Sequence, residues 1–414
     1  MKALIRHPAV HSLLAVFAST LLLVSRKPDS FLNAQFWAED GRNWYADAYN
    51  NGFFHALLTP EAGYFQTFSR IVASLAQALP LSAGPLFFNL VAALLQVAVA
   101  SFIVSDRMKT LLPERWTRYL LAFLYLSMPH TWEVFGNVTN SQWHLALLVC
   151  LILLSAPPVT GLGKAADILA ACISAVSGPF CLLLFPVAWT RAAMTRSRHV
   201  LTIAVVITAG CLVQAYSLLT KVRDVQSELG ASVELLVAMI GRHLVIGPLL
   251  GIRGFAVIEK AGLWGMGTAA ILTLAALILA GYAAWRASNE LRLLMLFTLL
   301  ICIGAFGWPA VTLEPGQWRV IAENPTALRY WFIPTFCLYA VLLYFVGDKT
   351  YPLRRKASVA ILAICFLGII ADWRIRPFRD LEFQTYAAEF ERVPSGTVYA
   401  IPINPDWKME LRKK

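Results

Sequence analysis

The sequence predicts an all-α polytopic membrane protein of about 11 transmembrane helices, because it is apolar throughout and contains long uncharged runs. Of the 414 residues, 58% are hydrophobic and only 14% are charged. A soluble domain is typically about 25% charged. Three runs lack Asp, Glu, Lys and Arg, and each approaches the ~20 residues that a helix needs to cross the hydrocarbon core. They are 86–105, 145–163 and 200–220.

The charges give these spans an orientation. With Lys2 and Arg6 in the cytoplasm, the inner segments carry 16 Lys/Arg and 5 Asp/Glu, and the outer segments carry 19 of each. The net charge of +11 therefore lies entirely on the inner face, as the positive-inside rule expects, and requires no nucleic acid as a partner. The expected spans within residues 1–371 are 9–25, 83–105, 118–130, 142–156, 165–178, 180–191, 199–219, 263–285, 292–310, 330–346 and 357–371.

Residues that interrupt the apolar runs define individual spans. Arg26-Lys27-Pro28 follows the first run where a cleaved signal peptide would have small residues, which predicts a retained first helix. Ser177-Gly178-Pro179 divides one run into two short helices. Irregular backbone at membrane depth needs a cover of protein or a wet cavity, so we expect an internal cavity that opens to the outer face. All seven cysteines lie in spans, which argues against disulfides in the outer loops.

We expect the functional residues in the segments outside the spans. These are four outer loops, 26–82, 130–142, 220–262 and 311–329, and a periplasmic tail, 372–414. In the first loop Glu39 and Asp40 are adjacent and flanked by large aromatic residues such as Trp37. Desolvation and a neighbouring like charge raise the pKa of a carboxylate, which suits a general base for a hydroxyl. Asp40 is preferred because Gly41 is expected to leave room for an acceptor. The alternative is a helix-starting acid pair in an interfacial aromatic belt.

The second loop is rich in amides, indoles and imidazoles. Such groups pair with sugar hydroxyls, and indole faces stack on sugar rings. The alternative is a polar turn whose groups satisfy one another. A zinc site from His130, Glu133 and His144 matches no familiar spacing. The candidate sugar- or acceptor-binding residues are Trp37, Glu133, Asn137, Asn140, Gln142, Trp143 and His144.

The third and fourth loops offer cations for a phosphate. Arg329 stands at the outer mouth of a helix beside Tyr330, where a guanidinium can grip a phosphate with two hydrogen bonds. Arg242 and Arg253 lie beside apolar runs and are the reserve candidates. The alternative for each arginine is an anchor to lipid headgroups.

These features together resemble the GT-C class of integral-membrane glycosyltransferases. The matching positions are Glu39-Asp40 after the first helix, Arg329-Tyr330 at a late outer helix mouth, and the C-terminal run 399–407, which is similar to the tail of an uncharacterised bacterial branch. The resemblance implies a bacterial inner-membrane enzyme with a polyprenyl-phosphate sugar as donor. It also implies inverting transfer, at the periplasmic face, to a hydroxyl on a cell-envelope glycan or lipid.

Two other functions stay open at this point. A flippase or transporter of a lipid-linked saccharide would need charges along its spans, and the spans are almost uncharged. An O-antigen ligase or polymerase also uses outer arginines but has no need of the early acid pair. Membrane lipids are expected partners, a divalent cation is neither required nor excluded, and the sugar and acceptor are not specified by the sequence.

Overall fold

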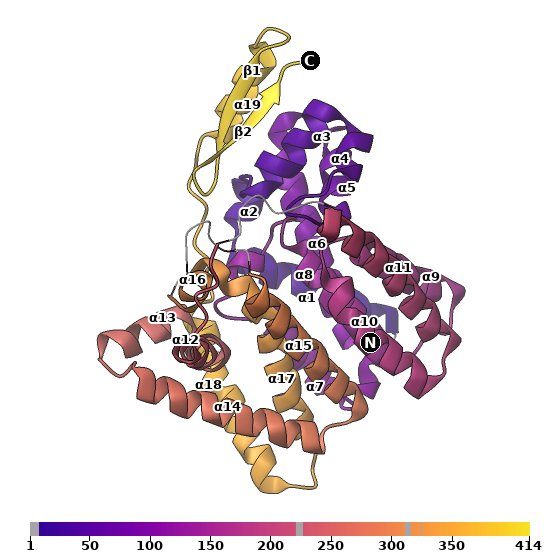
Figure 1. Ribbon diagram of the computed structural model, residues 1–414, viewed down its shortest axis with the longest axis vertical. Coiled ribbons are helices and arrows are strands. Elements are labelled where there is room, and N and C mark those ends of the chain that lie inside the picture. The colour runs from indigo at the N-terminus through magenta and orange to yellow at the C-terminus, as the bar shows by residue number, and fades with distance from the viewer. Residues whose placement is uncertain (1–7, 221–226, 310, 312–315, 324) are drawn as a thin grey trace.

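A computed structural model describes residues 8–220, 227–309, 311, 316–323 and 325–414. Long helices form the lower body of the molecule in Figure 1, and the first outer loop and the C-terminal tail lie together at its upper end. Lys2 and Arg6, on which the predicted orientation partly rests, lie outside the described residues, as do 221–226 of the third loop and 312–315 and 324 of the fourth.

A helix occupies each of the predicted spans. The helices are α1 (Pro8–Arg26), α6 (Gly84–Val104), α7 (Arg115–Ser127), α8 (Ser141–Leu154), α9 (Gly161–Ala175), α10 (Phe180–Thr195), α11 (Arg198–Thr220), α14 (Met266–Arg286), α15 (Asn289–Gly307), α17 (Phe332–Gly347) and α18 (Pro352–Ala371). Within the described ranges, six helical segments are long and apolar enough to cross a membrane: Leu81–Val104, Arg198–Thr220, Val233–Lys260, Met266–Arg286, Asn289–Gly307 and Ala327–Gly347.

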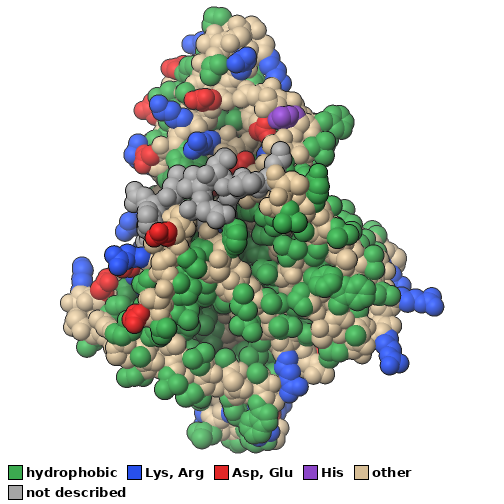
Figure 2. Space-filling model, viewed as in Figure 1, with side chains coloured by type: hydrophobic (Ala, Val, Ile, Leu, Met, Phe, Trp, Pro, Cys, Tyr) green, Lys and Arg blue, Asp and Glu red, His purple; other side chains and the backbone are tan. Residues whose placement is uncertain are grey.

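The outer surface of these helices is apolar. Leu219 on α11 is 83% exposed and Ile271 on α14 is 71% exposed. Figure 2 shows hydrophobic side chains across the middle of the molecule, with charged side chains gathered above them and at the lower and right edges. A soluble protein rarely exposes so large an apolar surface. The protein is therefore a helical membrane-embedded protein, with α8 and α17 buried at its centre.

The third loop is helical, as its mixture of charges and apolar stretches predicts. It forms α12 (Val233–Met239), the π-helix η6 (Ile240–Ile246) and α13 (Gly247–Lys260), one of the six membrane-length segments. Gly251, with φ of 72°, breaks α13, and the Asp372 carboxylate accepts the Ile252 N–H there at 2.6 Å. A Cβ on Gly368 of α18 would lie 2.8 Å from the Gly251 nitrogen, so these two helices approach closely because both residues lack side chains.

Short helices build the outer end of the molecule. The first loop contains α2 (Asp29–Leu32), the π-helix η2 (Asp40–Tyr45), α3 (Ala46–Asn51), α4 (Phe53–Leu58), α5 (Thr67–Ala76) and η3 (Leu81–Ala83). The other short elements are η4 (Asp106–Thr110), η5 (Trp132–Val134), α16 (Gln317–Glu323) and η7 (Pro325–Trp331).

The tail is folded and docks on the first loop. It contains α19 (Phe383–Arg392) and an antiparallel hairpin of β1 (Val398–Ile403) and β2 (Trp407–Arg412), which the all-α prediction does not include. The Ala38 N–H donates to the Asn404 carbonyl oxygen at 2.6 Å. A second hydrophobic core joins the two segments, with Phe36 and Trp44 from the loop and Phe390 and Ile403 from the tail among its members.

Candidate functional site

Asp40 joins the first and second outer loops. It begins the π-helix η2 and is 1% exposed. Its two carboxylate oxygens accept the backbone N–H groups of Val138 at 3.0 Å and Thr139 at 2.7 Å. The Trp44 indole N–H also donates to the Thr139 hydroxyl at 2.6 Å. Asp40 therefore holds the 137–140 turn in place as well as contributing a carboxyl group.

Burial raises the pKa of Asp40 to about 8, because water no longer solvates the carboxylate. The Val138 and Thr139 N–H groups partly oppose this rise, and the nearby Glu39 adds to it. At neutral pH the folded protein therefore holds a proton on Asp40 that the unfolded chain has lost.

This proton makes stability depend on pH. Between about pH 4, where unfolded aspartate ionises, and about pH 8, the free energy of unfolding contributed by Asp40 falls as pH rises. We expect the melting temperature of the wild type to fall relative to that of Asp40→Asn, which cannot ionise, across this range in lipid nanodiscs. Parallel melting-temperature curves for the two proteins would contradict the shifted pKa.

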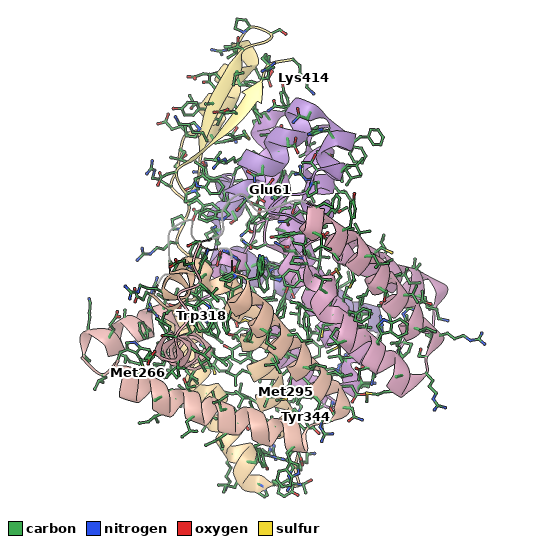
Figure 3. The ribbon with its side chains drawn as sticks, viewed as in Figure 1. Glu61, Met266, Met295, Trp318, Tyr344 and Lys414 are labelled. Carbon is green, nitrogen blue, oxygen red and sulfur yellow. The ribbon has the colours of Figure 1, made fainter. Side chains whose placement is uncertain are left out.

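Glu39 and Asp40 differ in their surroundings. The space that Gly41 is expected to leave open is filled, because a Cβ there would lie 2.9 Å from Ile403 Cδ1 and 3.1 Å from Phe36 Cβ. That expectation is wrong, since the tail docks on this side of Asp40. Glu39 is half-buried and accessible. Glu61, labelled in Figure 3, is another half-buried acid of the first loop, and it accepts a hydrogen bond from Asn43 at 2.9 Å.

The second loop uses most of its polar groups internally. Asn137 and Asn140 each donate to the Glu133 carbonyl oxygen, at 2.7 and 2.9 Å, and the Asn137 side-chain oxygen accepts the Asn140 N–H. His144 is buried between the Tyr125 hydroxyl and the Val134 carbonyl oxygen, both at 2.8 Å. These three residues fit the alternative of a self-satisfied turn better than they fit sugar binding.

Two further candidates, Trp143 and Gln142, lie at the start of α8. Trp143 is buried and packs edge-on against Phe180 at 4.7 Å. Gln142 is half-buried and lies against Gly178, where a Cβ would be 2.0 Å from its Oε1 atom. Gly178 therefore makes room for Gln142 at the break between α9 and α10.

Arg329 lies against Glu133 instead of open space. Its guanidinium forms an ion pair with the Glu133 carboxylate, and its backbone N–H donates to the same group at 2.9 Å. Its guanidinium also lies 4.9 Å from the centre of the Tyr330 ring. The predicted phosphate contact and a predicted sugar contact thus bind each other.

Removing this arginine should destabilise the fold. Arg329→Ala leaves the Glu133 carboxylate, 8% exposed, without its cation, and such a loss costs about 3 kcal/mol of unfolding free energy. We expect the double variant Glu133→Gln/Arg329→Met to recover part of that loss, since no buried charge remains. Thermal unfolding in nanodiscs measures the stability of the single and the double variant. A single variant as stable as the wild type would contradict a structural role for the pair.

The two reserve arginines differ in their surroundings. The Arg242 guanidinium donates to the Ala322 carbonyl oxygen at 3.0 Å and lies over the Phe255 ring at 4.2 Å. Arg253 is exposed, and its side chain has no ion-pair partner among the described residues. Arg253 lines a cavity.

This cavity has a volume of about 460 Å³ and lies where the ends of α1 and α18 meet α13 and the start of the tail. Five arginines and one carboxylate are in its wall. Asp372, the carboxylate, is engaged by the backbone of α13. The lining residues are Arg26, Trp37, His130, Thr131, Trp132, Ile252, Arg253, Asp372, Arg374, Ile375, Arg376, Pro377, Phe378, Arg379, Asn404 and Pro405.

The wall of this cavity contains both aromatic rings and arginines. The Trp37 ring stacks on Phe378 with centres 4.8 Å apart and meets Trp132 edge-on at 5.7 Å. Arg374 and Arg376 are exposed, and neither has an ion-pair partner in the part of the chain that the structure describes. The cavity can therefore hold an anion against its arginines and a ring or an apolar chain against its aromatics.

Of the site residues proposed from the sequence, Trp37 and Arg253 line this cavity, and the contribution of the tail to it was not predicted. The run Arg374-Ile375-Arg376-Pro377-Phe378-Arg379 is a local signal, because three arginines follow closely after the last span. Neither Glu39 nor Asp40 lines the cavity, although Trp37 in its wall lies only two residues before Glu39. No group of three or more His, Cys, Asp or Glu among the described residues has the arrangement of a metal site.

No protein-family model matches this chain. No curated protein matches it either.

Proposed function

We propose that the protein is a GT-C-type glycosyltransferase that moves a sugar from a polyprenyl-phosphate donor to an acceptor hydroxyl, with inversion. The cavity between the first loop and the tail carries this proposal. Its volume of about 460 Å³ is within the usual range of ligand sites, ~300–1,000 Å³. Its arginines match the charge of a phosphodiester, and its indole rings suit the C–H face of a sugar.

The position of the cavity also suits a lipid-linked donor. Three helices, α1, α13 and α18, end or bend around it, and Ile252 and Ile375 contribute apolar surface. A phosphate held by Arg374 and Arg376 would then lie at the outer end of these helices, with its chain directed along them. The donor needs a fixed cation, an aromatic wall and an apolar path, and this region supplies all three.

We assign the general base to Glu39 and a positioning role to Asp40. Glu39 takes the proton of the acceptor hydroxyl while the oxygen bonds to the anomeric carbon of the sugar. The bond from that carbon to the phosphate oxygen breaks, and its electron pair leaves on polyprenyl phosphate. The arginines of the cavity stabilise this added negative charge, so the step requires no divalent cation.

The decisive experiment separates cleavage from translocation. The purified protein in nanodiscs is given a panel of short-chain polyprenyl-phosphate sugars with an envelope extract as acceptor. We expect release of polyprenyl phosphate together with labelled sugar in the extract. Transport of intact donor across proteoliposomes without release would contradict the proposal and favour a flippase.

The docked tail supports an odd number of spans. Because Ala38 and Asn404 are hydrogen-bonded, the first loop and the tail lie on the same side of the membrane. We expect a cytoplasmic N-terminus and a periplasmic C-terminus in the bacterial inner membrane, so a periplasm-specific reporter fused after Lys414 should be active. A reporter active only in the cytoplasm would contradict this topology and, because the first loop and the tail share one side, would place the first loop in the cytoplasm as well.

A further inference from the structure

Arg42 and Trp407 form a pair of side chains where the first loop meets the tail. Arg42 belongs to the π-helix η2 and Trp407 begins β2, and the Arg42 guanidinium lies over the indole ring, 5.0 Å from its centre. The Arg42 side chain is exposed and Trp407 is half-buried. Within the described ranges, neither the guanidinium nor the indole N–H has an ion-pair or hydrogen-bond partner, and neither is enclosed. Both groups can therefore bind a ligand from the solvent side.

The strand β2 determines the direction of the indole. Side chains alternate along a strand, so Trp407 shares a face with Met409 and Leu411, which are buried in the second hydrophobic core. Part of the indole packs against this core. Arg412, near the other end of β2, is exposed on the opposite face. The core therefore holds Trp407 in position beneath the Arg42 guanidinium.

Two short segments connect this pair to the cavity. The first begins at Trp37, in the cavity wall, and reaches Arg42 five residues later. The second begins at Asn404 and Pro405, also in the wall, and reaches Trp407. Trp37 and Asn404 form a parallel bridge, so the two segments leave the cavity side by side. Glu39, the residue to which we assign the general base, lies in the first segment between the cavity and the pair.

Glu39 and Arg42 are also close in space. The Arg42 N–H donates to the carbonyl oxygen of Ala38, the neighbour of Glu39, at 3.1 Å. Burial raises the pKa of Glu61, labelled in Figure 3, and the charge of Glu39 adds to this rise while that of Arg42 opposes it. Both charged groups therefore act on the same carboxyl group of the first loop.

The chemistry of the pair favours one class of ligand. A guanidinium and an indole N–H are donors without acceptor capacity, so their partners must be acceptor oxygens. The hydroxyl oxygens of a sugar ring provide several such acceptors close together, whereas an acyl chain provides none. The hairpin of the tail rises away from the helical body and carries the C-terminus (Figure 1), so a ligand at its base has room to extend outward.

We propose that Arg42 and Trp407 form the acceptor subsite, and that the acceptor is a saccharide whose hydroxyl oxygens they bind on the far side of Glu39 from the cavity. The inference rests on the proposed function for the role of the saccharide as acceptor. Donor and acceptor then approach Glu39 from opposite sides, the donor from the cavity and the saccharide from the base of the hairpin. The tail contributes to both sites, through Pro405 and Trp407.

The test uses the protein in nanodiscs with lipid-free oligosaccharides released by mild acid from the envelope extract. Saturation-transfer difference NMR detects their binding without donor, and the transfer rate is measured against oligosaccharide concentration with donor present. Arg42→Met keeps an unbranched side chain and removes the guanidinium donors. Trp407→Phe keeps an aromatic ring against the core and removes the indole N–H. Arg412→Met is the matched control, since it removes an exposed guanidinium from the opposite face of β2.

We expect Arg42→Met to raise the oligosaccharide concentration at half-maximal rate about 10- to 100-fold, and Trp407→Phe to raise it about 3- to 10-fold. These are the losses of a charge-assisted and of a neutral hydrogen bond. The donor concentration at half-maximal rate and the melting temperature should stay close to those of the wild type, and Arg412→Met should behave as the wild type throughout.

Three results would overturn the acceptor subsite and leave the proposed function intact. The first is an unchanged oligosaccharide dependence in both variants, and the second is an equal loss in Arg412→Met. The third is labelled sugar in the lipid fraction alone, with no saturation transfer to the oligosaccharides. Oligosaccharide binding that requires Arg42, without any release of polyprenyl phosphate from the donor panel, would instead keep the saccharide site and overturn the proposed transferase.

Discussion

Glu39→Gln is expected to lower the rate of sugar transfer by about 10²- to 10⁴-fold, the usual contribution of a general base. The amide keeps the size of the side chain but cannot take the proton of the acceptor hydroxyl. Because Glu39 is half-buried and accessible, the substitution should leave the fold and the affinity for the donor close to those of the wild type. Single-turnover rates and donor affinity, measured on the same nanodisc sample, separate these effects.

Two variants of neighbouring acids complete this comparison. Glu61→Gln changes another half-buried carboxyl group of the first loop, and we expect transfer within a few-fold of the wild type. Asp40→Asn replaces an acceptor oxygen by an NH₂ group that faces the N–H of Val138 or Thr139, so it should lower stability together with activity. Full activity in Glu39→Gln with complete loss in a well-folded Asp40→Asn would assign the base to Asp40 instead.

Much of the helical architecture is predictable from the sequence, because it depends on local properties. A run such as 200–220 is apolar and uncharged over the length of a membrane helix, and α11 (Arg198–Thr220) forms there. The tail is different, since α19 and the hairpin are stabilised by contact with residues more than 300 positions earlier. The hydrogen bond between Ala38 and Asn404 has no signature near either residue.

In the candidate site, too, the local sequence indicates some residues but does not show contacts between distant ones. Trp37 and Arg253 could be proposed because aromatic and basic residues in outer loops are visible in the local sequence, and both line the cavity. Arg329 looked like a free cation for the same reason, but its partner Glu133 is 196 residues away. Whether a polar side chain is already satisfied depends on such distant contacts, which the local sequence does not show.

The double variant Arg374→Ala/Arg376→Ala is expected to weaken donor binding by about 100-fold or more, since a charge-assisted hydrogen bond to phosphate contributes about 10-fold or more at each arginine. Both side chains are exposed, so the fold should keep its stability. The change should appear in the donor concentration at half-maximal rate and should shrink at high salt, because solvent screens exposed charges.

Arg392→Ala is the matched control, since Arg392 is an exposed arginine at the end of α19 and does not line the cavity. Replacing Arg376 with lysine keeps the charge and removes the planar fork, so we expect an intermediate loss. If the double variant used the donor as well as Arg392→Ala does, the phosphate would have to bind elsewhere. The Arg329–Glu133 pair would then have to open to receive it, and Arg329→Lys would be the variant that weakens donor binding.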